Sequence, residues 1–180
     1  MQKTGIIRKV DDLGRIVIPK ELRKNLKIRE GDLLEISLAE NNKIILEKYE
    51  PLGENFKVFS KYLEVMAKNT NNTCILTDTE KVIFSFGPNS NLYKDKKLKN
   101  TFIDEIFKRS ISMHYNKVHT IVEDEDIRGI SNEKIGIINV DGSIIGAVIM
   151  LTNNYAKRFG DLEEKLLNQA VDFFTIQMEI

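Results

Sequence analysis

Residues 5–19 read GIIRKVDDLGRIVIP, and this stretch decides how the first part of the chain folds. Residues 5–10 alternate in the manner of a strand, and residues 15–18 are rich in the β-branched side chains that favour strands. Between them, residues 11–14 are turn formers, and the last is a glycine that can adopt a positive φ. The stretch therefore predicts a β-hairpin.

The residues that follow complete a short β-β-α-β-β unit. Pro19 suits the first turn of a helix because it has no N–H to satisfy, and residues 20–26 carry two leucines four apart on one helical face. The apolar pattern that follows predicts two strands, over residues 34–38 and 43–49, joined by a tight turn of two asparagines. We take residues 1–50 as one domain.

A unit of about fifty residues buries only a modest part of its surface and is marginally stable alone. The one cysteine, Cys74, lies outside it, and it contains no cluster of metal ligands. Oligomerisation is the remaining source of stability, so we expect residues 1–50 to fold as an intertwined dimer.

Residues 51–55 are expected to form a linker, and residues 56–180 a second domain with a central antiparallel sheet flanked by helices. The overall fold class is therefore α+β. The first expected elements are a helix from residue 56 that ends within 69–72, and strands over 73–77 and 81–86. A second helix is expected from a capping box at 101–104 to about residue 111, followed by strands over 117–122, 133–140 and 143–151. The last element is a helix capped by Asp161 and Glu164 that runs to about residue 178.

Charge is distributed unevenly along the chain. The whole sequence has 27 basic and 27 acidic side chains, so its formal net charge is +0. Residues 1–29 carry nine basic and three acidic side chains, a net of +6, whereas residues 30–50 carry two and six, a net of −4. The remaining residues carry 16 and 18, a net of −2. The basic character that nucleic-acid binding requires is therefore confined to the first 29 residues.

Basic side chains gather on two predicted elements of this segment. A helix would place Lys20, Arg23, Lys24 and Lys27 on one face. A hairpin would bring the basic residues at positions 8, 9 and 15 close together. Two copies in a dimer would form one broad cationic surface suited to a DNA backbone, with arginine forks able to meet phosphates and guanine edges. The alternative interpretation is a solvated charged face without a partner.

Residues 5–23, GIIRKVDDLGRIVIPKELR, followed by LKIREGD at 26–32, closely resemble the DNA-binding domain of AbrB-type transition-state regulators. The resemblance implies a domain-swapped β-hairpin dimer that forms a small β-barrel and binds double-stranded DNA. The positions that it assigns to DNA contact are Arg8, Arg15, Arg23 and Lys24, and the basic surface adds Lys9 and Lys20. Position 24 holds a lysine where an arginine is typical of the family. The lysine keeps the positive charge but lacks the bidentate fork of a guanidinium.

The second part, with its strand at 146–149 and long C-terminal helix, resembles the GAF-like domain that follows this module in some regulators of the family. That resemblance implies a homotetramer in which the terminal helices pack between subunits. The last helix has an apolar face wide enough for both a sheet and a partner. Its members are Leu162, Leu166, Leu167, Ala170, Val171, Phe173, Phe174 and Met178.

The function implied is a sequence-selective regulator of sporulation genes, acting as activator and repressor, whose GAF-like domain senses a signal or drives tetramer assembly. Two alternatives stay open. The first is an antitoxin-like module with a protein partner, which a disordered C-terminal tail would favour. The second is a small-molecule sensor with an unidentified ligand. The longest apolar run, residues 144–151, is too short to cross a membrane, and we expect a cytoplasmic protein.

We expect neither a catalytic site nor a cofactor or metal. His114 and His119 have a spacing that does not suit two helical zinc ligands, and the acidic run 123–126 lacks the pattern of a calcium loop. Cys74 lies in an apolar strand and is interpreted as a small buried hydrophobe. The lysine-rich run 94–99 is interpreted as a mobile loop rather than a second DNA contact.

Overall fold

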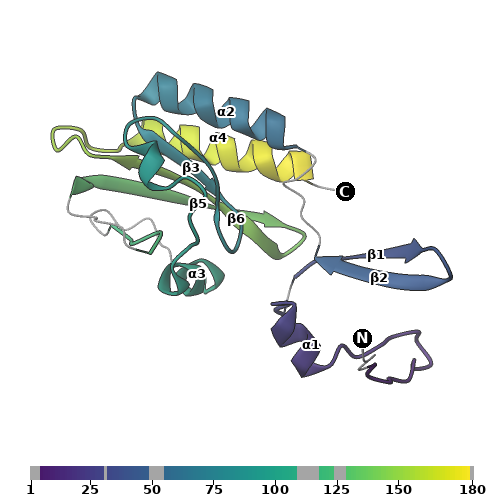
Figure 1. The fold of residues 1–180 in the computed structure, drawn as a ribbon. Helices are drawn as coiled ribbons and strands as arrows, with labels where there is room; N and C mark the ends of the chain where they lie inside the picture. The colour runs from purple at the N-terminus through teal and green to yellow at the C-terminus, as the bar shows by residue number, and fades with distance from the viewer. Residues whose placement is uncertain (1–4, 31, 49–54, 109–117, 124–128, 179–180) are drawn as a thin grey trace. The chain divides into compact units, whose positions relative to one another are not determined.

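The computed structural model describes residues 5–30, 32–48, 55–108, 118–123 and 129–178. The chain divides into two compact units, residues 1–49 and residues 50–180, and each is described by itself (Figure 1). Among the described residues, none of the helices combines the length and the apolar content that a membrane span requires.

The described residues of the N-terminal unit form one short helix and one hairpin. Helix α1 spans Lys20–Asn25, and strands β1, Leu34–Ala39, and β2, Lys43–Lys48, pair antiparallel with Leu38 opposite Ile44. Asn41 and Asn42 both adopt left-handed backbone conformations, with φ of 65° and 55°. The two-asparagine turn and the elements on either side of it are confirmed.

The first predicted hairpin is only partly formed in the single chain. Its turn is present, since the Gly14 amide donates to the Asp11 carbonyl at 3.1 Å and Gly14 has a φ of 77°. Residues 5–10 and 15–18, however, are not strands, so that prediction is wrong for one copy. A strand needs a ladder partner, and the apolar side chains of this segment find little to pack on: Ile7 is 90% exposed and Val17 is 74% exposed.

The C-terminal unit is a four-stranded antiparallel sheet with helices on both faces. The strands are β3, Thr73–Thr77, β4, Val82–Phe86, β5, Asn132–Val140, and β6, Ser143–Thr152, in the order β4-β3-β6-β5. Helices α2, Phe56–Thr70, and α4, Asp161–Met178, lie side by side on one face (Figure 1). Helix α3, Asn100–Phe107, packs on the other face, and a short 3-10 turn, η1, spans Ser90–Leu92.

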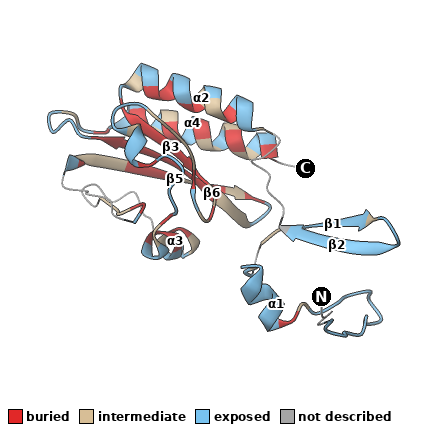
Figure 2. Cartoon of the chain, viewed as in Figure 1, coloured by how far each residue is buried: buried red, intermediate tan, exposed pale blue. Residues whose placement is uncertain are grey.

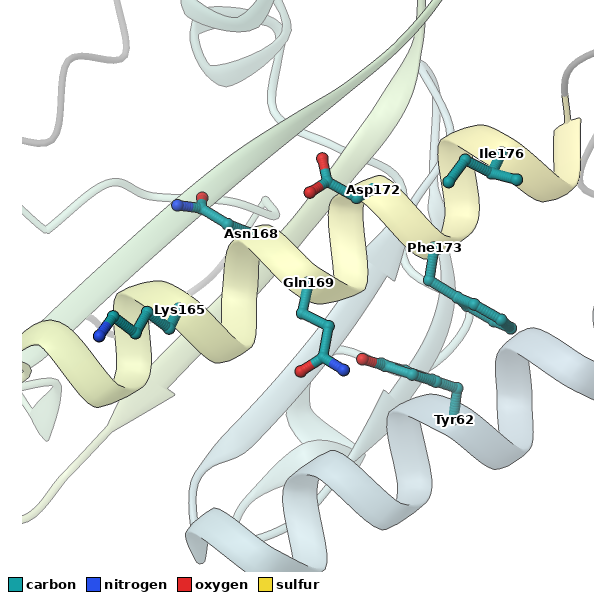
Figure 3. Close-up of a pocket in the computed structure, with 7 residues that line it drawn as sticks. All are labelled: Tyr62, Lys165, Asn168, Gln169, Asp172, Phe173 and Ile176. Carbon is teal, nitrogen blue, oxygen red and sulfur yellow. The ribbon is translucent and has the colours of Figure 1, made fainter.

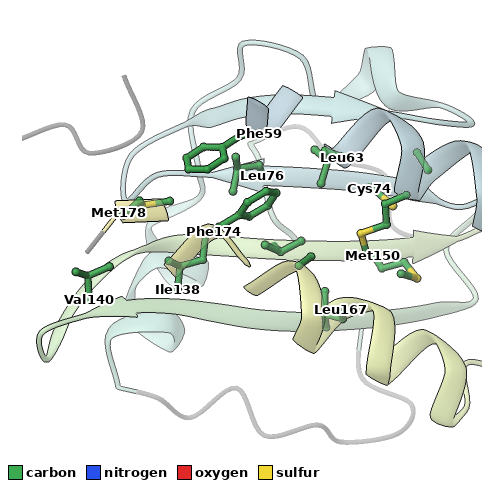
Figure 4. Packing of buried hydrophobic residues seen from close by; sticks show 14 of the residues in the cluster. Phe59, Leu63, Cys74, Leu76, Ile138, Val140, Met150, Leu167, Phe174 and Met178 are labelled. Atoms are coloured by element: carbon green, nitrogen blue, oxygen red, sulfur yellow. The ribbon is translucent and has the colours of Figure 1, made fainter. Parts of the chain in front are cut away.

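Each face of the sheet has its own hydrophobic core, because successive side chains of a strand point to opposite faces. On β3, Cys74 and Leu76 join the cluster under α2 and α4, whereas Ile75 joins the cluster under α3. Figure 4 shows Phe59 of α2 and Phe174 of α4 meeting above the sheet; their ring centroids are 4.7 Å apart. Burial is accordingly concentrated in this unit (Figure 2).

Three predicted features of this unit are corrected by the structure. Helix α3 has Lys99 at its N-cap with no side-chain cap, so Thr101 opens no capping box. The predicted strand over 117–122 is reduced to a single bridge, Leu98 to Val122, and residue 117 lies outside the described residues. The Glu133 carboxylate accepts the His119 amide at 2.9 Å, which takes a donor that a strand ladder would use.

The third correction concerns the start of α4. Glu163, not Glu164, reaches back to accept the Gly160 amide at 3.0 Å. Glu164 instead pairs with Lys134 of β5 at 2.7 Å. That pair ties α4 to the sheet.

Backbone hydrogen bonds join the lysine-rich run 94–99 to neighbouring segments. The Lys96 carbonyl accepts the Val82 amide, and the Lys99 amide donates to the Ile121 carbonyl, both at 2.8 Å. Lys97 forms a bridge with Lys81 beside β4. Backbone hydrogen bonds therefore hold this segment, which apolar periodicity could not indicate.

Candidate nucleic-acid interface

The six predicted DNA contacts all lie on exposed positions of the N-terminal unit. Arg8 and Lys9 precede the 11–14 turn, Arg15 follows it, and Lys20, Arg23 and Lys24 belong to α1. The Arg8 guanidinium donates to the neighbouring Ile7 carbonyl at 3.2 Å. A role of these six positions in DNA contact stays a prediction.

Helix α1 is short because its last residues turn sharply. It follows Pro19, which is buried, and it ends at Asn25, with Leu26 as its C-cap. Lys27 adopts a left-handed conformation with a φ of 54°, and the Ile28 amide donates back to the Arg23 carbonyl at 2.8 Å. Lys27 therefore lies beyond the helix, and the predicted basic face of α1 is limited to Lys20, Arg23 and Lys24.

The turn before α1 is built around one carboxylate. Asp11 Oδ1 accepts the Arg15 amide at 2.7 Å and the Leu13 amide at 3.1 Å, and Asp11 Oδ2 accepts Arg15 Nε at 2.7 Å. These donors favour the charged form and hold the pKa of Asp11 below its usual value, chiefly through the Arg15 amide. The sequence identified Asp11 only as a turn former. An aspartate side chain often accepts backbone amides a few residues further along the chain, here those of Leu13 and Arg15. This tendency is the signal that could have indicated the role of Asp11 in organising the turn.

The outer face of the helix layer carries a groove of about 470 Å³ (Figure 3). It is lined by Tyr62, Lys165, Asn168, Gln169, Asp172, Phe173 and Ile176. The rings of Tyr62 and Phe173 stack with centroids 4.8 Å apart, so α2 and α4 share this surface. A separate hollow of about 130 Å³ is bordered by amide and hydroxyl side chains, among them the buried Asn72.

Among the residues that the structure describes, no group of three or more His, Cys, Asp or Glu side chains is placed to hold a metal ion. His119 Nδ1 lies 2.6 Å from the Glu133 carboxylate, and its Nε2 lies 3.4 Å from that of Glu105, so the ring bridges two groups on opposite sides. His114 and residues 124–126 lie outside the described residues. Burial raises the pKa of Cys74 to about 12, so its thiol is not a nucleophile at neutral pH.

Comparison with known protein families gives two matches that together span most of the chain. The model of the stage V sporulation protein T C-terminal family, described as a transcription factor, matches residues 55–179. The model of the MazE family, described as a bacterial antitoxin in antidote-toxin recognition, matches residues 7–53.

Individual relatives agree with this division. Stage V sporulation protein T of Bacillus subtilis (strain 168) is 32% identical over 187 residues, which cover 99% of each chain. The transition state regulatory protein AbrB of the same organism is 61% identical over 51 residues, 28% of this chain and 52% of that protein. The cofactor-binding GAF domain of the nutrient sensor CodY from Clostridium difficile matches 72% of this chain and 98% of that domain, with a TM-score of 0.52 and 13% identity, which shows a shared fold.

Proposed function

Because the chain belongs to the stage V sporulation protein T family of transcription factors, we propose that it is a sequence-selective DNA-binding regulator of sporulation genes, acting as activator and repressor in the cytoplasm. The observation that carries the proposal is the exposure of all six basic side chains, three of them beside the 11–14 turn and three on α1. Their arginines would meet phosphates and some base edges, while the deformability of the duplex adds specificity.

DNA binding in this proposal requires two copies of the N-terminal unit. One face of the β1-β2 hairpin is apolar and exposed, with Leu38 83% exposed and Ile36 69% exposed. A two-stranded hairpin is marginally stable in water. A second copy would cover these side chains and supply the ladder partners that residues 5–10 and 15–18 lack, which forms the swapped-hairpin dimer.

Assembly of dimers into a tetramer would use the outer face of α4. Leu162, Leu166, Gln169, Phe173 and Ile176 follow one another at spacings of four and three, the rhythm of a coiled-coil seam. This seam lies beside the stripe that packs on the sheet, and Leu162 and Ile176 are 66% and 63% exposed. The seam is therefore available to a second copy.

Charges beside the seam favour an antiparallel pair of α4 helices. Lys165 and Asp172 are seven residues apart, both exposed, on the same flank of the seam. In an antiparallel pair around a two-fold axis, Lys165 of one copy lies opposite Asp172 of the other, twice over. A parallel pair would place Lys165 opposite Ala170, with no charge to match.

The DNA-binding proposal is tested by a salt titration of the full-length protein on duplex DNA. The four positions that the family resemblance assigns to DNA contact, Arg8, Arg15, Arg23 and Lys24, give eight contacts per dimer. Affinity should therefore fall by roughly 10³–10⁵-fold between 50 and 200 mM salt. Arg15→Ala should abolish binding and leave the oligomer intact in sedimentation. An affinity that is flat across this salt range contradicts the proposal.

The assembly proposal is tested by charges placed in the seam. Phe173→Asp should halve the mass of the oligomer in sedimentation and leave the helical circular dichroism in place. Leu92→Asp is the matched control, because Leu92 is 58% exposed on η1, away from the seam. Lys165→Asp should weaken the tetramer, and Asp172→Lys in the same chain should restore it; a restoration that fails excludes the antiparallel register.

The two alternatives fare differently. An antitoxin-like module would end in a tail with little structure of its own, whereas residues 55–108 and 129–178 form a sheet with two packed cores. This favours the regulator. A sensing role for the GAF-like unit is compatible with assembly, and a thermal-shift screen of metabolites against the full-length protein tests it.

A further inference from the structure

We propose that Asp11 is a positioning residue that orients Arg15 for reading DNA, and that it raises sequence specificity while lowering overall affinity. The inference rests on the proposed DNA-binding function. It assigns a role to an acidic residue at the centre of a basic surface, where a carboxylate would otherwise oppose binding.

Asp11 accepts hydrogen bonds from both the backbone amide and the side chain of Arg15. One carboxylate oxygen accepts the Arg15 amide and the other accepts Arg15 Nε, each at 2.7 Å. The Asp11 amide in turn donates to the Arg15 carbonyl at 3.1 Å, so the two residues are also joined through the backbone. The direction of the Arg15 side chain is therefore fixed relative to the turn.

This contact determines which edge of the guanidinium faces outward. A guanidinium can make a bidentate contact through Nε and one terminal nitrogen or through its two terminal nitrogens. With Nε directed at Asp11, the edge formed by the two terminal nitrogens points away from the carboxylate. Arg15 is 71% exposed, so this edge is accessible to a phosphate or to the O6 and N7 atoms of guanine.

The Asp11 carboxylate also opposes the binding of DNA of any sequence. Its two backbone donors and the Arg15 side chain keep it ionised, in agreement with its lowered pKa. An ionised carboxylate beside a DNA-binding surface repels phosphates and reduces the net charge that the duplex meets. Asp11 should thus oppose sequence-independent binding and support the sequence-dependent part.

The test compares Asp11→Asn with Asp12→Asn in the full-length protein. Asparagine at position 11 keeps an oxygen for the turn amides, but its NH₂ group cannot accept Arg15 Nε. Asp12 is the adjacent exposed aspartate, so its substitution removes the same charge and leaves the Asp11–Arg15 contact in place. The probes are a short duplex selected by the wild-type protein from a random pool, and a duplex of unrelated sequence.

Both variants should bind the unrelated duplex about two- to tenfold more tightly, since each removes one negative charge per chain. Only Asp11→Asn should lower the ratio of selected to unrelated affinity, by about tenfold, because a bidentate arginine contact discriminates by about 1–3 kcal/mol. An unchanged ratio in Asp11→Asn, or an equal loss in Asp12→Asn, would overturn the proposal.

A double-mutant cycle covers the case in which Asp11→Asn disturbs the turn itself. Arg15→Lys keeps the charge and has no Nε or fork, so adding Asp11→Asn to it should change the ratio no further. An additive loss would mean that Asp11 acts through the turn and not through Arg15. Failure of the wild-type protein to prefer any duplex would instead contradict the proposed function, which separates the two results.

Discussion

The two units of this chain handle apolar side chains in opposite ways. In the described part of the N-terminal unit, Pro19 alone is buried, and large apolar residues are exposed on the turn, the helix and the hairpin. In the C-terminal unit, the sheet is covered on both faces and residues such as Phe59 and Phe174 are fully buried (Figure 2). One unit has its core within the chain, and the core of the other is incomplete in one copy.

The same contrast is visible in two aspartates that form similar turns. Asp11 and Asp78 each accept two backbone amides through one carboxylate oxygen. The pKa of Asp11 is lowered, chiefly by the hydrogen bond from the Arg15 amide. The pKa of Asp78 is raised, because burial destabilises its charged form by more than the backbone hydrogen bonds stabilise it. Local sequence sets the turn, and the surrounding fold sets the energy of its charge.

The largest effect should come from removing a side chain of the completed core. Phe174→Ala should lower the free energy of unfolding of the C-terminal unit by about 3–5 kcal/mol, because it leaves a cavity next to Phe59 and Tyr62. Denaturant titration followed by circular dichroism measures this. Leu92→Ala, at a 58% exposed position of η1 in the same unit, should change it by less than about 0.5 kcal/mol.

The incomplete core should respond to concentration instead. On dilution of the full-length protein, amides of β1 and β2 should lose protection from hydrogen exchange, whereas those of β3 and β6 should keep theirs. The reason is that the proposed N-terminal core forms between copies. Leu38→Asp should move this loss to higher concentration. Equal protection of both units at all concentrations would show that the N-terminal unit is stable as one copy.

The core of the C-terminal unit should also protect its cysteine. Cys74 is fully buried and its pKa is raised to about 12, so iodoacetamide should not label it in the native protein at neutral pH. Labelling should appear only at denaturant concentrations that unfold this unit. Rapid labelling without denaturant, detected by mass spectrometry, would show that the β3 region opens locally.

The smallest effects on stability should come from protonation of Asp11 and Asp78, and the two effects have opposite signs. A lowered pKa means that the Asp11 contacts contribute above its ordinary pKa of 3.8 and are lost as the pH falls below it. A raised pKa means that protonation of Asp78 relieves a cost, so this group adds stability as the pH falls. Amide chemical shifts of Arg15 and Lys81 through an acid titration report the two turns. A common direction for both carboxyl pKa shifts would contradict the contrast.

Local patterns predicted most elements that pair with sequence neighbours. The β1-β2 and β5-β6 hairpins, with their left-handed Asn41, Asn42, Asp141 and Gly142 turns, form as the alternation and turn residues indicate. The strands expected over 5–10 and 15–18 are not formed in the single chain, where these segments have no ladder partner. The sequence also predicts six basic positions for DNA contact, which stay a prediction, and it could not show that Lys27 lies beyond the helix in a left-handed conformation.

Contacts between distant segments were beyond local patterns. The Glu133 carboxylate accepts the His119 amide, which interrupts the strand expected there. Glu164 was expected to cap α4 and pairs with Lys134 of β5 instead. In both cases a side chain far along the sequence competes for a polar group, and only the tertiary fold brings it within reach.

The Asp11–Arg15 contact also has a consequence for the entropy of binding. A free arginine side chain has about 2 kcal/mol of rotamer entropy, part of which is lost when it is fixed against a ligand. Arg15 gives up some of that freedom when the turn folds, before any duplex is present. In the proposed DNA contact, its ordering would belong to the folding of the turn rather than to DNA binding, and the arginine would meet each sequence in one orientation.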